Sequence, residues 1–393
     1  MQNVEQKRAR IVTFDILRGF FLLVILIDHL NYHTFFYEIF SGRGSLFASA
    51  AEGFFLISGL LVGYLFVEKM KYHPRQTTRR LLKRAAVLYA WSIGLTVAFT
   101  LLGYTLFQLG GVKALIWPGV FSDGSVLSFL WKLITLQYVY GWADFLSHYV
   151  VFMAIAPVVV WLTAHGKAWL AVIGSMTVWW FGHKQGFNYA WQVLFMLGIV
   201  AGYYLPQVES WWQRQTLKMQ RSIFLSLVVV SISTILFSLA VSVFAPYIIS
   251  QMIYAPTLMP LAHLLTDFGS VFGRYVDKDS LEYGRLIFAL LWFVTTYLVV
   301  RTYEKAIVKY TKSFLNTIGA RSLYVYGLQA FIVFFAHILV QNSTNFFINF
   351  AVITIAIALT YLAARYYSVI TSMPLVIMKK FKQRTITYEK ASH

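Results

Sequence analysis

The sequence predicts an all-α, polytopic integral membrane protein with about ten transmembrane helices and both termini in the cytoplasm. Hydrophobic residues make up 59% of the 393 residues and charged residues only 12%, whereas about 25% are charged in soluble proteins. The apolar residues lie in runs of roughly the 20 residues that cross a bilayer. The 33 Lys and Arg against 15 Asp and Glu give a net charge of +18. Because the basic residues lie between apolar runs, they indicate membrane topology and not a basic face for nucleic acid.

Apolar runs of spanning length follow one another along the chain. They cover residues 11–32, 46–68, 85–108, 145–164, 168–183, 188–205, 222–243, 286–303, 322–341 and 347–370. We expect one helix from each run. No small-residue cleavage site follows the basic N-terminus, so we expect the first helix to be retained and not removed as a signal peptide. The stretch 123–142 is also apolar, but Lys132 lies near its middle.

The distribution of basic residues decides whether 123–142 crosses the membrane, because cytoplasmic loops carry an excess of Lys and Arg. With ten spans, the basic segments at 7–10, 69–84, 214–221, 305–321 and 379–384 all lie in the cytoplasm. An eleventh span at 123–142 would move the last three outside. We therefore expect a single domain over residues 1–393, with an external or re-entrant lobe at 109–143 and a second external segment at 244–285.

Several kinds of chemistry are excluded by residue types and spacings. The chain has no cysteine, which excludes disulfides, thiolate metal sites and a cysteine nucleophile. No His-Glu-x-x-His motif indicates a zinc site. No GxSxG element and no glycine-rich phosphate-binding motif is found either. We expect no metal and no permanently bound cofactor.

The first span contains four ionisable residues, Asp15, Arg18, Asp28 and His29. Ionisable residues inside a span are costly and are therefore candidates for function. Asp15 and Arg18 are spaced i, i+3 and can pair, although a purely structural ion pair explains them equally well. Arg18 and His29 are eleven residues apart, which is roughly 16 Å along a helix and close to three full turns. Both side chains are thus expected on one face, with Arg18 nearer the cytoplasm.

The second span brings a carboxylate to the level of His29. Glu52 lies near its outer end, and either Glu52 or Asp28 could orient the imidazole and stabilise its protonated form. The alternative for Glu52 is an ordinary acid at a helix start. Ser58 lies deeper in the same span, where its hydroxyl could line a cavity. With these neighbours, His29 could act as a general base.

The sequence resembles membrane acyltransferases of the acyltransferase-3 type. Two elements carry the resemblance, the Arg-x10-His pair of Arg18 and His29 and the Phe-Phe-x-x-Ser-Gly run at 54–59. The OpgC-like branch, named for succinyl transfer to osmoregulated periplasmic glucans, is similar in further elements. These are Ala50-Ala51-Glu52, the segment DFLSHY at 144–149 with Ala156-Pro157, the segment FNYAWQVLF at 187–195, and the region 281–288 with Arg285. The chain departs from the family at Tyr189, in place of a proline, and at Gln329, where many members carry a histidine.

The resemblance implies an O-acyltransferase of the bacterial inner membrane. It would move an acyl group from cytoplasmic succinyl-CoA or acetyl-CoA to a sugar hydroxyl of a periplasmic glucan or another glycan. His29, with Asp28, Glu52 and Arg18 around it, would act as general base or would carry the acyl group covalently. The basic segment at 69–84 would receive the CoA phosphates, although binding of anionic lipid headgroups gives the same pattern. The candidates for the donor site are Asp15, Arg18, Ser58, Arg79, Arg80, Lys83 and Arg84.

Polar residues that the topology brings to the external face are candidates for the acceptor site. A sugar needs an apolar surface for stacking and polar groups for its hydroxyls; an interfacial aromatic belt is the alternative for any single tryptophan. The candidates are Asp144, His148, Asn188, Trp191, Gln192 and Arg285. The expected partners are acyl-CoA, a glycan and the lipid bilayer, without nucleic acid. The oligomeric state stays open, with a homodimer among the alternatives.

Two other functions remain open from the sequence. A transporter or flippase for a lipid-linked or anionic solute would also need spans with intramembrane charges, but it leaves the Arg18–His29 spacing unexplained. A structural membrane subunit would leave His29 and Glu52 without a purpose.

Overall fold

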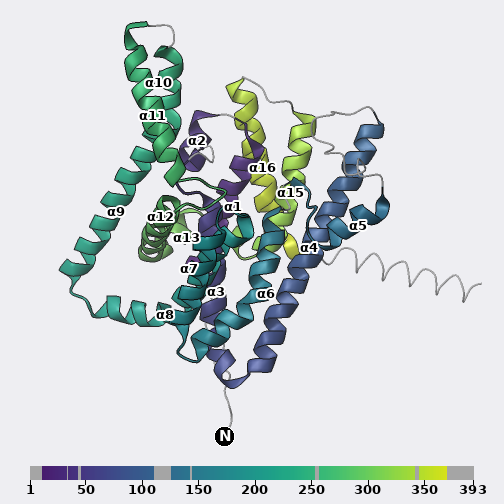
Figure 1. Ribbon diagram of the computed structural model, residues 1–393, viewed down its shortest axis with the longest axis vertical. Helices are drawn as coiled ribbons and strands as arrows, with labels where there is room; N and C mark the ends of the chain where they lie inside the picture. The colour runs from purple at the N-terminus through teal and green to yellow at the C-terminus, as the bar shows by residue number, and fades with distance from the viewer. Residues whose placement is uncertain are drawn as a thin grey trace, which may run out of the picture.

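The computed structural model describes residues 11–32, 34–42, 46–109, 125–141, 144–252, 256–340 and 345–369. All regular secondary structure in these residues is helical (Figure 1). The helices of the first half are α1 (Val12–Leu30), α2 (Phe35–Ser41), α3 (Ala50–Tyr72), α4 (Pro74–Gln108), α5 (Val126–Ile134), α6 (Asp144–Ala164), α7 (Ala168–Gly182) and α8 (Phe187–Arg214). The helices of the second half are α9 (Leu217–Leu239), α10 (Ala245–Met252), α11 (Met259–Tyr275), α12 (Tyr283–Thr302), α13 (Glu304–Tyr310), α14 (Phe314–Gly319), α15 (Ser322–Leu339) and α16 (Phe346–Arg365).

The all-α class is confirmed, and each of the ten expected runs contains a helix. Within the described residues, 8 helices are long and apolar enough to cross a membrane. They correspond to α3, α4, α6, α8, the run from α9 into α10, α12, α15 and α16. Helix α1 has 19 residues but carries Asp15, Arg18 and Asp28, and α7 is apolar with 15 residues.

The two expected external segments contain shorter helices. Helix α5 has nine residues and is about 13.5 Å long, less than half of the roughly 30 Å hydrocarbon core of a bilayer. The Ile134 carbonyl at its end accepts a hydrogen bond of 2.8 Å from the Tyr89 hydroxyl on α4. Residues 110–124 and 142–143 of the expected lobe lie outside the described residues. In the second segment, α10 and α11 pack on each other and extend beyond the bundle (Figure 1).

Helix α3 lies at the centre of the bundle and contacts α1, α4, α6, α8 and α12. Its closest neighbour is α8, and small residues on both helices explain the close approach. A Cβ on Gly59 or Gly63 would overlap the backbone of Phe195 or Ile199. A Cβ on Gly202 of α8 would likewise overlap the backbone of Leu60. Two interlocking Gly-x-x-x-Gly runs, 59–63 and 198–202, therefore hold the two helices together.

Helix α1 contacts α3, α12, α14 and α15. Near its first turns, Gly19 and Gly319 of α14 are so close that a Cβ on either would overlap the other helix's backbone. Near its last turn, the carbonyl of Leu30 lies 3.0 Å from Nε2 of His337 on α15, and the ring of His337 stacks on Tyr32. These contacts fix both ends of α1, which carries Arg18 at one level and His29 at another.

Candidate active site

A cavity of about 420 Å³ opens beside His29 at the end of the bundle where α1 finishes. It is formed by α1, the start of α3, the first turns of α6 and α8, the loop between α11 and α12, and α15. Its lining residues are Ile25, Asp28, His29, Ser49, Ala51, Asp144, Phe145, His148, Trp191, Lys278, Asp279 and Tyr326. The cavity thus brings together two imidazoles, three carboxylates, one lysine and a tyrosine, and we name it the outer cavity.

The structure places the Glu52 carboxylate against Arg285 and Ser49. Its Oε1 atom accepts a bond of 2.5 Å from the Arg285 guanidinium, and its Oε2 accepts from the Ser49 backbone at 2.9 Å and from the Ser49 hydroxyl. The carboxylate is fully buried and does not line the outer cavity. The alternative interpretation, an acid that caps a helix start, describes its position. Within the described residues, no hydrogen bond joins the His29 ring to Asp28 or Glu52.

Arg285 also differs from its expected place in an acceptor site. Its side chain is only 3% exposed and lies at the start of α12. Besides Glu52, its guanidinium contacts the carbonyls of Leu46 and Val276, each at 3.3 Å. A buried arginine needs such partners, because an uncompensated charge in the interior is costly. Arg285 therefore joins the start of α3 to the loop that precedes α12.

This loop, residues 276–282, is held in place from several sides. The indoles of Trp179 and Trp191 donate to the carbonyls of Leu281 and Lys278, each at 3.0 Å. Asp277 accepts from the Ser280 backbone at 2.9 Å and from its hydroxyl at 2.7 Å. Burial alone would raise the pKa of Asp277, but the Ser280 hydrogen bonds and the charge of Arg285 outweigh it and lower that pKa below its usual value. The carboxylate therefore stays charged at neutral pH.

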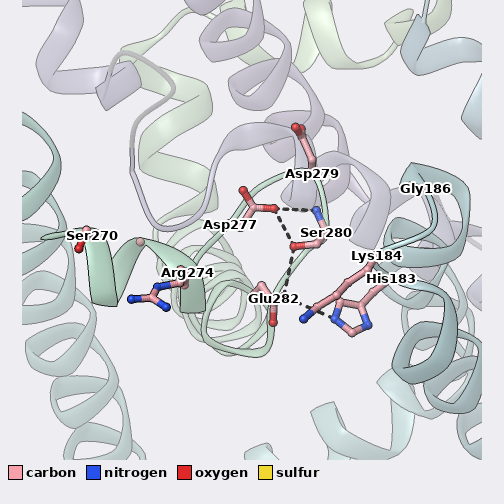
Figure 2. Close-up of a pocket in the computed structure, with 10 residues that line it drawn as sticks. His183, Lys184, Gly186, Ser270, Arg274, Asp277, Asp279, Ser280 and Glu282 are labelled. Atoms are coloured by element: carbon pink, nitrogen blue, oxygen red, sulfur yellow. Dashed lines mark hydrogen bonds and ion pairs between the residues drawn. The ribbon is translucent and has the colours of Figure 1, made fainter.

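A second pocket, of about 740 Å³, lies on the other side of the same loop. Figure 2 shows His183 and Lys184 from the α7–α8 turn on one side and Arg274 of α11 on the other. Between them, Nε2 of His183 lies 3.4 Å from the carboxylate of Glu282. Asp279 lines both this pocket and the outer cavity. The two spaces are thus adjacent, with one acidic side chain in their common wall.

Two more acceptor candidates lie beside the outer cavity but do not line it. The Asn188 carbonyl oxygen lies 2.8 Å from Nδ1 of His148, so it supports a histidine that faces the cavity. The Gln192 amide is bound to Ser175 of α7, by bonds of 2.7 Å with the hydroxyl and 2.8 Å with the carbonyl. Gln192 therefore joins α8 to α7. Among the predicted acceptor residues, the cavity itself brings together Asp144, His148 and Trp191.

A separate cavity of about 650 Å³ lies toward the other end of the bundle, and we name it the basic cavity. Five of the predicted donor-site residues line it, Arg18, Ser58, Arg80, Lys83 and Arg84. Lys69 adds a further positive charge, and the remaining walls are apolar apart from Tyr149. A concentration of guanidinium and ammonium groups around a deep apolar cleft suits a ligand with phosphates at one end.

Two predicted donor residues lie elsewhere. Arg79 is exposed on α4 and does not line the basic cavity. Asp15 lies where α1 meets α14, with its backbone carbonyl against Gly319. The sequence could not separate them from Arg18 and Arg80, because all four lie at the same end of their helices. Only the rotation and packing of each helix decide which of these side chains face the basic cavity.

Both cavities are lined by the same four helices, one cavity above the other. Helices α1, α3, α6 and α15 contribute Arg18, Ser58, Tyr149 and Leu323 to the basic cavity. The same helices contribute His29, Ala51, His148 and Tyr326 to the outer cavity. Because α1 is continuous from Val12 to Leu30, Arg18 and His29 lie roughly 16 Å apart along its axis.

Aromatic rings occupy the region between the cavities. The Arg18 guanidinium lies 5.7 Å from the centre of the Phe54 ring. Phe54 also packs against Phe145, with ring centres 5.3 Å apart. Phe145 in turn packs against Tyr326, at 5.6 Å, and both line the outer cavity. These contacts link Arg18, which lines the basic cavity, to Phe145 and Tyr326, which line the outer cavity, and we name the three rings the aromatic partition.

Four residues beside His29 were not among the predicted site residues: Lys278, Asp279, Tyr326 and Gln329. The first two lie in the mixed-charge loop between α11 and α12, and the last two lie on the face of α15 toward α1. A polar residue in an otherwise apolar span was the available signal for Gln329. Within the described residues, no group of His, Asp and Glu side chains is arranged to hold a metal ion.

Comparisons with known proteins identify a family but no individual relative. Neither the curated proteins nor the solved structures contain a match to the chain. A family model described as OpgC protein matches residues 10–372. The match covers nearly the whole chain, including both cavities and the helices that join them, and we conclude that the chain belongs to the OpgC protein family.

Proposed function

We propose that this protein is a multi-pass O-acyltransferase that moves a succinyl or acetyl group from acyl-CoA, bound in the basic cavity, to a glucan hydroxyl in the outer cavity. The observation that carries the proposal is the pair of cavities on the same four helices, one rich in Arg and Lys and the other containing His29. Membership in the OpgC family favours succinyl transfer to a glucan over a transporter or flippase.

In the proposed topology, α1 and α7 cross the membrane together with the eight other spans. Both termini then lie in the cytoplasm, and the protein resides in the bacterial inner membrane. The basic cavity faces the cytoplasm, where acyl-CoA is available, and Arg80, Lys83 and Arg84 receive the CoA phosphates. The outer cavity faces the periplasm. This arrangement agrees with the excess of Lys and Arg in the segments assigned to the cytoplasm.

The acyl thioester passes the partition of Phe54, Phe145 and Tyr326 to reach His29. In one route, His29 removes the proton of the sugar hydroxyl while the oxygen adds to the thioester carbonyl carbon. The tetrahedral intermediate then expels CoA as a thiolate, which takes the proton from His29. In the other route, an imidazole nitrogen first displaces CoA and forms an acyl-histidine, which the hydroxyl then attacks. Asp28 and His148 lie in the same cavity as His29.

The acceptor sugar occupies the outer cavity, where Asp144, His148 and Lys278 offer polar contacts. Trp191 is fully buried in the wall behind them and offers no exposed face for stacking. A glucan is longer than one sugar, so the neighbouring units need a path away from His29. The shared wall at Asp279 supports a path into the pocket of Figure 2.

The test is acyl transfer by purified protein with succinyl-CoA or acetyl-CoA and a glucan, following CoA release and acylated product. We expect His29→Ala to reduce transfer by a factor of at least about 10² to 10⁴, which is the contribution of a general acid–base group. The control is His165→Ala, because His165 is exposed at the end of α6 and its described contacts are with Trp161, one turn earlier. Undiminished transfer by His29→Ala would refute the mechanism. Acylation of wild-type protein that hydroxylamine removes, and that His29→Ala lacks, would indicate the covalent route and not the direct one.

A further inference from the structure

One buried side-chain amide beside His29 makes no hydrogen bond to the described residues. Gln329 lies on α15 and is only 4% exposed, and neither its Nε2 nor its Oε1 has a hydrogen-bond partner among the described residues. An amide in the interior of a protein is normally hydrogen-bonded, because desolvation without a partner is costly. A buried amide without a partner therefore requires an explanation, and one explanation is that it binds a ligand group.

Gln329 borders a small recess that continues from the outer cavity. The recess has a volume of about 10 Å³, and its walls are Ile25, Leu26, His29, Tyr326, Gln329, Ala330 and Val333. Ile25, His29 and Tyr326 also line the outer cavity, so the recess opens beside the imidazole. Apart from the imidazole and Tyr326, the amide of Gln329 is the polar group in this wall. A volume of this size accepts about one water-sized atom and not a chain.

The chemistry of the proposed reaction supplies such an atom. When a hydroxyl or an imidazole adds to a thioester, the carbonyl oxygen becomes an oxyanion close to the attacking nitrogen or oxygen. A donor already fixed in an apolar, water-poor site stabilises this charge more strongly than a donor in water. The donor also loses no existing hydrogen bond when it binds the oxyanion, because it has no partner among the residues that the structure describes.

We propose that Gln329 is a catalytic residue whose Nε2–H group donates a hydrogen bond to the acyl carbonyl oxygen as that oxygen becomes the oxyanion. This inference rests on the proposed acyl transfer at His29. The electron pair of the C=O bond moves onto the oxygen that occupies the recess when the nucleophile adds. It returns when the C–S bond breaks and CoA leaves. The side-chain oxygen of Gln329 is then available to accept from the His29 ring or from the sugar hydroxyl.

The test compares Gln329→Met and Gln329→Glu with wild-type protein. Methionine has a similar length and flexibility but no donor, and a glutamate carboxylate repels an oxyanion. We expect kcat to fall about 10² to 10³-fold in both variants, the usual effect of losing one oxyanion donor. We expect acyl-CoA affinity, measured by equilibrium binding to purified protein, to change less than about threefold, because the bond forms only in the transition state.

A matched variant separates this role from a structural one. Gln192 is a second buried glutamine, but its amide is fully engaged with Ser175. Gln192→Met should therefore lower the Tm in detergent, whereas Gln329→Met should leave the Tm unchanged or raise it, since it removes an unsatisfied polar group. A lower Tm with unchanged kcat for Gln329→Met would overturn the proposal, as would unchanged kcat at unchanged Tm.

The outcome for the wild-type protein distinguishes the two proposals. If wild-type protein releases no CoA and acylates no glucan, the proposed function fails. If wild-type protein transfers the acyl group and Gln329→Met does so at the same kcat, only the role of Gln329 fails. A loss of acyl-CoA binding in Gln329→Met at unchanged kcat would also count against it, because it would indicate a ground-state contact with the donor.

Discussion

Glu52 and Asp28 are both acids expected near His29, but they have different surroundings in the structure. Glu52 is bound by Arg285 and Ser49 in a buried cluster, whereas Asp28 lines the outer cavity next to His29 in the chain. A buried ion pair adds little stability over an apolar pair, but the loss of one partner leaves an uncompensated charge. The two acids should therefore respond differently to neutralisation.

We predict that Glu52→Gln destabilises the protein, by about 3–5 kcal/mol in the range found for broken buried pairs. Asp28→Asn should lower transfer and leave the Tm within a few degrees of wild type. Thermal unfolding in detergent and CoA release by the folded fraction measure the two effects. In the double variant Glu52→Gln/Arg285→Gln, part of the lost Tm should return, since no lone charge remains. A Glu52→Gln protein with a normal Tm and no transfer would show that Glu52 acts on His29 after all.

At the scale of helices, the contact between α3 and α8 decides where both cavities lie. Helix α3 contributes Ser58 to the basic cavity and Ala51 to the outer one, and α8 contributes Trp191. Close approach of the two backbones depends on four glycines, since van der Waals contact drives helix association in a lipid environment. A side chain at this contact would push the helices apart and displace residues of both sites.

We predict that Gly63→Ala lowers the Tm and the yield of folded protein, because its Cβ would overlap the Ile199 carbonyl, a backbone group that cannot move independently. The matched control is Gly94→Ala on α4, where a Cβ meets nothing within 4 Å. This control should be neutral or stabilising by up to about 1 kcal/mol, because alanine is the better helix former. Equal behaviour of the two variants would contradict the role of the close contact.

At the scale of the whole molecule, function depends on which end of the bundle faces the cytoplasm. The basic cavity and the exposed ends of α3 and α4 lie at one end, and the outer cavity with the α10–α11 hairpin lies at the other (Figure 1). In the proposed reaction, donor and acceptor therefore approach from opposite sides of the membrane, with the aromatic partition between them. The sidedness is open to a direct test because the chain contains no cysteine.

We predict that single cysteines report this sidedness in right-side-out spheroplasts treated with a membrane-impermeant maleimide. Asp267→Cys on α11 should be labelled at once, because Asp267 is exposed and the proposed topology places α11 outside the cytoplasm. Arg75→Cys and Tyr310→Cys should be labelled only after permeabilisation. Tyr310 is 80% exposed, and it would face outward if residues 123–142 formed an eleventh span. Early labelling of Tyr310→Cys would therefore refute the ten-span topology.

The sequence alone was enough to predict the helices and the family, and it named several residues that line the two cavities. Long apolar runs form helices because a bilayer leaves no other way to satisfy the backbone, so their existence is a local property of the chain. The spacing of Arg18 and His29 on one helix likewise follows from helix geometry. Ionisable residues inside a span are costly. Arg18, Asp28 and His29 are therefore candidates for function from the sequence alone.

Only the tertiary structure decided which polar groups share a cavity and which hold helices together. Glu52, Gln192 and Arg285 carry the same chemical groups as residues that bind ligands, but buried partners far away in sequence engage them. Conversely, Gln329 and Lys278 lie beside His29 through the packing of α15 and of the loop before α12. The physical reason is that a side chain's role depends on what it contacts once the helices have packed. Helix rotation and the meeting of distant segments follow from the sum of many contacts, and no single stretch of the sequence contains them.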